Sequence, residues 1–199
     1  VAQQVATLPQ KLKTSFDPIL GPVITRAVSD GRLHDVAAQV AQVGFWILAA
    51  QTGIALALGI PSSAVMGLAG ADFVAGAGAL AFLLLAEVVA STAVTSESAL
   101  VYLAPRRNLV LSLVMISSQA VLSFAFCLVV RRLGWPPVAY SVAVAFALSC
   151  ALGIGSLLKS RLLGRITGAR VTGWRPALFW AAAGAIVLGW LATRMPEWI

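Results

Sequence analysis

The chain has 199 residues, of which 60% are hydrophobic and only 11% are charged, and its formal net charge is +7. Soluble domains carry about 25% charged residues, so this composition excludes an ordinary soluble domain and indicates an integral membrane protein. The basic residues lie in short segments between apolar runs and form no aromatic-interleaved basic face, so we expect no nucleic-acid partner.

The opening segment, residues 1–29, mixes apolar residues with charges and three prolines. It is either an amphipathic helix that lies on the membrane surface or a broken helix that crosses the membrane. In the second case its cations, Lys11, Lys13 and Arg26, must face the protein interior, where they could hold an anionic group. In the first case the lysines snorkel to the interface. The sequence leaves both interpretations open.

Five later runs are long enough, at 1.5 Å per residue, to cross about 30 Å of hydrocarbon. They are residues 36–60, 73–103, 109–130, 138–158 and 177–193. Tryptophans flank the last run, as they do at membrane interfaces. The predicted fold class is therefore all-α: a polytopic transmembrane helix bundle with five full spans after an amphipathic or broken N-terminal helix. We expect one membrane domain over residues 1–199.

The loops between these runs differ in charge, which predicts an orientation. If the chain crosses the membrane at each run, the loops at residues 30–35, 105–108 and 159–175 share one side. The basic residues on that side number eight: Arg32, Arg106, Arg107, Lys159, Arg161, Arg165, Arg170 and Arg175. Those on the other side number three: Arg131, Arg132 and Arg194. The positive-inside rule places the first side in the cytoplasm.

Glu87 is the most informative acidic residue, because it lies near the middle of an apolar run, where an ionised carboxylate costs a few kcal/mol or more. It either faces a cavity and couples to an ion, or is neutral and hydrogen-bonded to a neighbouring Ser or Thr. Asp17 in the opening segment is a second candidate for a cavity or ion-coupling role. Glu97 is closer to the cytoplasmic end, near Arg106 and Arg107, and we expect it to be paired or to snorkel.

Groups that catalyse reactions are scarce in the sequence. We find no nucleophile–base pair, metal cluster or phosphate-binding loop. The single histidine, His34, lies in a charged turn beside Asp35, where we expect it in solvent. Cys127 and Cys150 lie inside apolar runs and should pack as small hydrophobes. We therefore expect no enzyme activity, no metal and no cofactor.

Residues 15–40, with the sequence SFDPILGPVITRAVSDGRLHDVAAQV, resemble a recurring segment of polysaccharide and lipid-linked oligosaccharide flippases. These flippases belong to the multidrug/oligosaccharidyl-lipid/polysaccharide exporter superfamily. The family pattern is a helix with a proline near its end, a polar turn around a Gly-Asp-like pair, and the start of the next helix. Pro22, Arg26 and the pair Asp30-Gly31 match it here.

Two further stretches are similar to the same family. In residues 67–86, Gly70, Asp72 and Phe73 stand for the family's turn before a helix that begins with small residues, although Ala69 replaces the usual aromatic residue. Residues 104–114, APRRNLVLSLV, resemble the short basic turn at which another helix begins.

The resemblance implies the second lobe of a two-lobe exporter, beginning within that lobe's second helix and completed by an N-terminal lobe. Residues 177–193 would be an additional helix. It further implies that a polyprenyl-pyrophosphate-linked glycan is flipped across the bacterial cytoplasmic membrane by alternating access, among membrane lipids. Cationic cavity residues would attract the pyrophosphate, a role that falls on Lys11, Lys13 and Arg26.

Three other functions remain open from the sequence. The chain could belong to a cation-coupled multidrug exporter of the same superfamily, with Glu87 as its acid. A membrane-embedded transferase would have to use His34 and Asp35. A structural membrane subunit would pack against a partner without transporting anything.

Overall fold

The computed structural model describes residues 2–4, 17–169, 171 and 174–194, and the described part of the chain is helical without strands. The elements follow in the order α2 (Asp17–Ser29), α3 (Leu33–Gly59), α4 (Ser62–Leu68), the 3-10 helix η1 (Ala71–Gly76), α5 (Ala77–Leu103), α6 (Pro105–Arg132), α7 (Val138–Thr167) and α8 (Pro176–Arg194).

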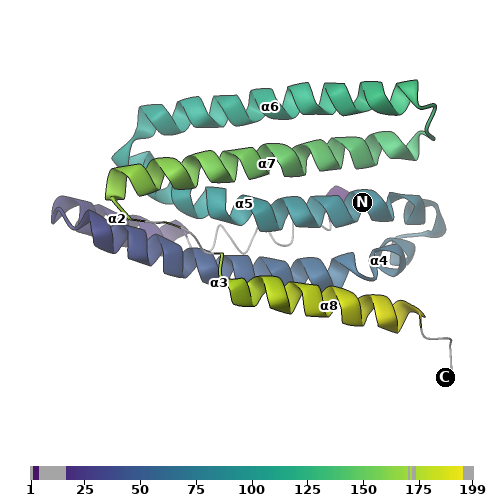
Figure 1. Ribbon diagram of the computed structural model, residues 1–199, viewed down its shortest axis with the longest axis horizontal. Coiled ribbons are helices and arrows are strands. Elements are labelled where there is room, and N and C mark those ends of the chain that lie inside the picture. The colour runs from purple at the N-terminus through teal and green to yellow at the C-terminus, as the bar shows by residue number, and fades with distance from the viewer. Residues whose placement is uncertain (1, 5–16, 170, 172–173, 195–199) are drawn as a thin grey trace.

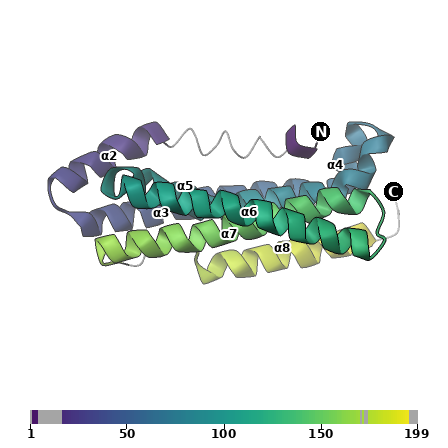
Figure 2. The same ribbon diagram turned by 90° about the horizontal axis from the view of Figure 1, so that it is seen from above.

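The long helices lie side by side in the order α6, α7, α5, α3, and α8 flanks α3 (Figure 1). The helix α2 lies at the end of the bundle where α3 begins, on the opposite side of the row from α8 (Figure 2). At this same end α5 and α7 end and α6 begins. We call it the basic end, because Arg32, Arg106, Arg107, Arg161 and Arg165 lie there.

Among the described residues, four helices are long and apolar enough to cross a membrane: α3, α5 together with η1, α6 and α7. The chain is accordingly a multi-pass membrane protein. The prediction of an all-helical bundle is confirmed, but the fifth predicted span is not. The apolar part of α8, Pro176–Gly189, is shorter than the other four.

The residues just before α8 contact the middle of the bundle. Trp174 donates a hydrogen bond from Nε1 to Thr92 Oγ1 at 3.1 Å, in the middle of α5. The guanidinium of Arg175 lies 4.3 Å from the ring centroid of Phe45, well inside α3. As a result α8 begins partway along the bundle rather than at its basic end (Figures 1 and 2). The sequence analysis was wrong to place Arg175 in a loop at that end.

The boundary of α7 also differs from the sequence prediction. The run ending at residue 158 was expected to pass into a basic loop, whereas α7 continues to Thr167 and ends at Gly168, whose φ is 70°. Lys159 is therefore a helical residue. The helix continues because Leu162, Leu163 and Ile166 keep an apolar face packed against the core at the basic end.

Two glycines make the turns around α3 and η1 possible. Gly31, with φ 70°, joins α2 to α3, and Gly70, with φ 133°, leads from α4 into η1. Side chains other than glycine rarely adopt such angles. The first turn is further held by Arg32, which donates a hydrogen bond to Asp30 at 2.7 Å. This interaction raises the pKa of the Arg32 guanidinium above its ordinary value.

The opening segment is described only in part. α2 is a helix of 13 residues with Pro22 inside it, and it rises about 20 Å, too little to cross the hydrocarbon alone. Its residues Ile24 and Ala27 are buried against α3 and α5 in the core cluster of the basic end. Residues 5–16 lie outside the described part of the chain, so the choice between a surface helix and a broken spanning helix stays a prediction.

The contact between α5 and α7 is made by small and hydroxylated side chains. The Ser149 hydroxyl donates to the Phe82 carbonyl at 2.9 Å, and the Ser156 hydroxyl donates to the Val89 carbonyl at 2.6 Å. Both bonds cross between the helices at a spacing of seven residues, so the same faces of α5 and α7 stay together over two turns. Small residues allow this close approach, as is usual between membrane helices.

Candidate functional site

A partly buried ion pair joins α7 to α5 near the basic end. Lys159 Nζ donates to Glu97 Oε2 at 2.8 Å and to Ser112 Oγ of α6 at 3.1 Å. The amide of Asn108, at the start of α6, lies 3.5 Å from Glu97 Oε1, the limit of hydrogen-bonding distance. Three helices therefore contribute to one polar cluster.

The positions of the two partners follow from helix geometry. Glu97 lies about 9 Å before the end of α5, and Lys159 lies about 12 Å before the end of α7, at 1.5 Å per residue. Lys159 continues the α7 face that carries Ser149 and Ser156, so it points toward α5. An isolated charge at such a depth is costly in a membrane protein, and pairing with a carboxylate is the usual way in which it is accommodated.

The two partners differ in their access to solvent. The Lys159 side chain is only 1% exposed, whereas that of Glu97 is 40% exposed. The exposed part of Glu97 faces a cavity of about 310 Å³ between α2 and α5, which Gly21, Ser98 and Tyr102 also line. A Cβ atom on Gly21 would lie 3.2 Å from the Tyr102 hydroxyl, so glycine is what allows α2 to come this close.

This arrangement restricts what the site can do chemically. The carboxylate of Glu97 can meet a proton, a cation or a hydroxylated ligand from the cavity, while its other side holds Lys159. A proton or cation that took the place of Lys159 would leave a buried ammonium without its counter-charge. Binding in the cavity is therefore coupled to the junction of α5, α6 and α7.

The structure places the predicted site residues as follows. Lys11 and Lys13 lie outside the described residues, and Asp17 is the first residue of α2, with a side chain that is not described. Arg26 is exposed on α2 and is not among the residues that line the Glu97 cavity. Glu87 is buried within α5 and does not line that cavity either. Of the predicted site residues, only Arg26 and Glu87 have described side chains, and neither lines the Glu97 cavity.

Lys159 is the site residue that sequence reasoning missed. It was counted as a loop cation because it follows the apolar run at once. The available signal was the helical spacing of Ser149, Ser156 and Lys159, which places all three on one face of a continued helix. Glu97 was expected to be paired, and it is, but with Lys159 rather than with the arginines that follow it in sequence.

His34 and the two cysteines lie in the surroundings that we expected from the sequence. His34 is exposed in the first turn of α3. Cys127 on α6 and Cys150 on α7 are half-buried free thiols. Within the described ranges, no three His, Cys, Asp or Glu side chains are grouped so that they could hold a metal ion.

Comparisons of this chain with protein-family models, with curated proteins and with solved structures find no match.

Proposed function

We propose that the chain is part of a transporter that flips a lipid-linked oligosaccharide or polysaccharide precursor across the bacterial cytoplasmic membrane by alternating access. The observation that carries transport is the Glu97–Lys159 pair, buried among membrane-length helices and open to a cavity on one side. Ionisable residues at such positions mark substrate or ion pathways. A structural subunit would need the ion pair to hold α5 and α7 together, but it would not need the pair to be open to a cavity.

The substrate class rests on the resemblance to the flippases, and the helix junctions support it. The three stretches that carry the resemblance fall at the α2–α3 turn, the α4–η1 turn and the α5–α6 turn. Gly31 and Gly70 adopt positive φ at the first two turns, and Pro105 occupies the first position of α6 at the third. Each stretch is thus a junction between helices, as the family pattern requires.

The orientation is part of the proposal. Lys159 is buried and Arg175 lies partway along the bundle, so neither is counted here. The other described side chains still give an unequal distribution of charge. Arg32, Arg106, Arg107, Arg161 and Arg165 lie at the basic end, and Arg131 and Arg132 lie at the other. This supports a cytoplasmic basic end. The lipid-linked precursor would then be taken up from the leaflet on the side of the basic end.

A complete pathway needs more helices than the described row. The Glu97 cavity is bounded by α2 and α5 on one side of the row. We propose that an N-terminal lobe packs against this side of the row and closes the cavity, as the two-lobe architecture implies. The opening segment, with Lys11, Lys13 and Arg26, would line the same space and attract the pyrophosphate.

Glu97 also favours a second candidate, a cation-coupled multidrug exporter of the same superfamily, because its carboxylate is open to the cavity. Measurements of proton-driven dye efflux, normalised to the amount of folded protein, distinguish a role of Glu97 from a role of Glu87. Loss of efflux in Glu97→Asp together with retention in Glu87→Gln would support this candidate. Equal efflux in the wild type and in both variants would exclude coupling through either acid.

Deleting the gene that encodes the chain tests the leading proposal. We expect surface glycan to fall strongly, lipid-linked precursor to accumulate, and the intact gene to restore both. Staining of surface glycan and extraction of the polyprenyl-linked pool measure these effects. A deletion strain with normal surface glycan and no accumulated precursor would overturn the proposal.

A further inference from the structure

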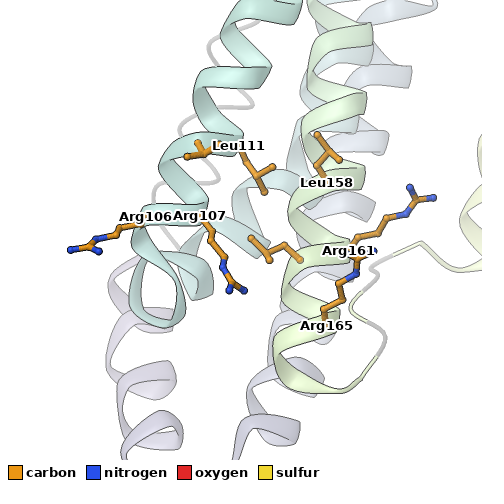
Figure 3. A pocket seen from close by; sticks show the side chains of 8 residues that line it. Arg106, Arg107, Leu111, Leu158, Arg161 and Arg165 are labelled. Atoms are coloured by element: carbon orange, nitrogen blue, oxygen red, sulfur yellow. The ribbon is translucent and has the colours of Figure 1, made fainter.

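A cleft between α6 and α7 at the basic end plays no part in the proposed transport pathway. Its volume is about 490 Å³, and it is lined by aliphatic side chains, among them Leu111 and Leu158, and by four arginines: Arg106, Arg107, Arg161 and Arg165. Figure 3 shows the Arg107 side chain extending into the gap between the two helices, while Arg106 points away from it. The size is within the 300–1,000 Å³ that is usual for small-ligand sites.

The positive charge of this cleft is not neutralised by neighbouring side chains. All four arginines are exposed, and none forms an ion pair with a carboxylate of the described residues. Glu97, the acid of α5 that lies nearer the basic end, is already held by Lys159. The positive charges of four arginines at this end of α6 and α7 repel one another, so an anion bound beside Arg107 would relieve the repulsion.

The N-terminus of α6 also favours a bound anion. Arg106 and Arg107 lie in the first turn of α6, at the positive end of the helix dipole, where cations are unfavourable and anions are favoured. The first backbone N–H groups of a helix have no intrahelical acceptor and serve as anion donors. Guanidinium groups bind phosphate oxygens in pairs of parallel hydrogen bonds. Phosphate is therefore the chemistry that this cleft fits.

The surface next to the cleft indicates what carries the phosphate. Val110, which lines the cleft, and Val114 and Val121, which continue the same face of α6, are exposed. A molecule with a phosphate in the cleft and hydrocarbon along α6 satisfies both surfaces, and basic pockets between membrane helices on the cytoplasmic side bind lipid head groups. We propose that this cleft binds the phosphate head group of an anionic membrane lipid, whose acyl chains lie along the outer face of α6.

This site is separate from the proposed transport pathway. The cleft is formed by α6 and α7, whereas the Glu97 cavity is formed by α2 and α5. Lipid binding can therefore be measured on protein that transports nothing, and failure of either proposal leaves the other standing.

The test uses the purified chain in neutral detergent, titrated with phosphatidylglycerol, phosphatidylcholine or sodium phosphate. Thermal unfolding and native mass spectrometry report binding. We expect phosphatidylglycerol to raise Tm and to be retained on the protein, and the other two to do neither. A shift by sodium phosphate equal to that by phosphatidylglycerol would overturn the lipid assignment, because free phosphate would then suffice. An equal shift by phosphatidylcholine would overturn recognition of the anionic head group.

Two pairs of arginines on the same helix provide a matched comparison. R106Q/R107Q removes two exposed charges at the cleft, and R131Q/R132Q removes two exposed charges at the opposite end of α6. Each arginine near an anionic lipid surface contributes about fivefold in affinity, so we expect R106Q/R107Q to weaken phosphatidylglycerol binding about 25-fold.

R131Q/R132Q should leave the affinity unchanged, and R161Q/R165Q should reproduce the loss from the α7 side of the cleft. Because all these side chains are exposed, the variants should fold. Full affinity in R106Q/R107Q, or an equal loss in R131Q/R132Q, would overturn the site.

Discussion

Two neighbouring helices with the same hydropathy have very different surroundings. The most apolar windows of α6 and α7 have mean hydropathies of 2.2 and 2.1, yet 39% of the α7 window is buried and only 6% of the α6 window. α6 lies at the edge of the row and α7 between α6 and α5 (Figure 1). Hydropathy identifies both as spans and says nothing about which of them is in the core.

Side-chain size separates the two helices where hydropathy does not. The buried residues of α7 are mostly Ala, Gly and Ser, whereas the exposed face of α6 carries Leu, Val, Ile and Phe. Lipid tails are as apolar as a leucine side chain, so helices in a bilayer associate through close contact and hydrogen bonds rather than through the hydrophobic effect. Small residues permit that contact, and it brings Ser149, Ser156 and Lys159 within reach of α5.

The largest effect should come from removing the partner of Lys159, the buried charged residue of α7. Glu97→Gln leaves the ammonium of Lys159 buried without a counter-charge, which we expect to cost about 3–5 kcal/mol in the free energy of unfolding. Lys159→Met leaves the carboxylate of Glu97, which reaches the cavity and its water, so it should cost less than half as much. Unfolding in mixed detergent micelles measures both values.

The double variant E97Q/K159M is the control for this pair. It removes both charges, so it should recover most of the stability that E97Q loses, and the two single effects should not add. Additive losses would show that the residues do not act as a pair. Equal losses of stability in E97Q and K159M would contradict the difference in burial between Glu97 and Lys159.

A smaller loss is expected where α6 approaches α7 most closely. A Cβ atom on Gly155 would lie 2.6 Å from Met115 Sδ and 3.1 Å from Met115 Cγ. Gly155→Val should therefore cost about 1–3 kcal/mol through overpacking. Unfolding in micelles measures the loss.

Gly153→Ala is the control, since its Cβ would lie 3.6 Å from the Val89 side chain, an ordinary contact. That variant should be neutral or more stable by about 0.5–1 kcal/mol, because alanine favours the helix. A Gly155→Val protein as stable as the wild type would mean that α6 and α7 are not in close contact.

The contrast between α6 and α7 also explains how much of the fold could be predicted from the sequence. Long uncharged runs identify spans, because the cost of burying charge in hydrocarbon applies to every residue of a run. The boundary at residue 158 was wrong because a single lysine was taken as the end of a span. In the structure one carboxylate on another helix suffices to keep that lysine inside. The start of α8 partway along the bundle was equally hidden, since it depends on contacts of Trp174 with α5 and of Arg175 with α3.

The candidate site was harder to predict than the fold. Glu87 was preferred over Glu97 because it lies nearer the middle of its run, but position within a run does not show which face of a helix meets a cavity. That face is set by α2, which approaches α5 at Gly21 and Tyr102. Contacts of this kind join residues far apart in the chain, and a single sequence does not specify them.

The smallest expected effect tests whether the outer face of α6 contacts lipid. Val121 and Val130 lie on the same helix and differ in exposure, at 67% and 3%. Val130→Ala removes two buried methyl groups and should cost about 1–2 kcal/mol through lost packing contacts. Val121→Ala should stay within about 0.5 kcal/mol of the wild type, as exposed substitutions do. If both variants lose the same stability in unfolding experiments on the full-length protein, protein rather than lipid covers the face of α6 at Val121. The acyl chains of the proposed lipid would then have to follow another surface.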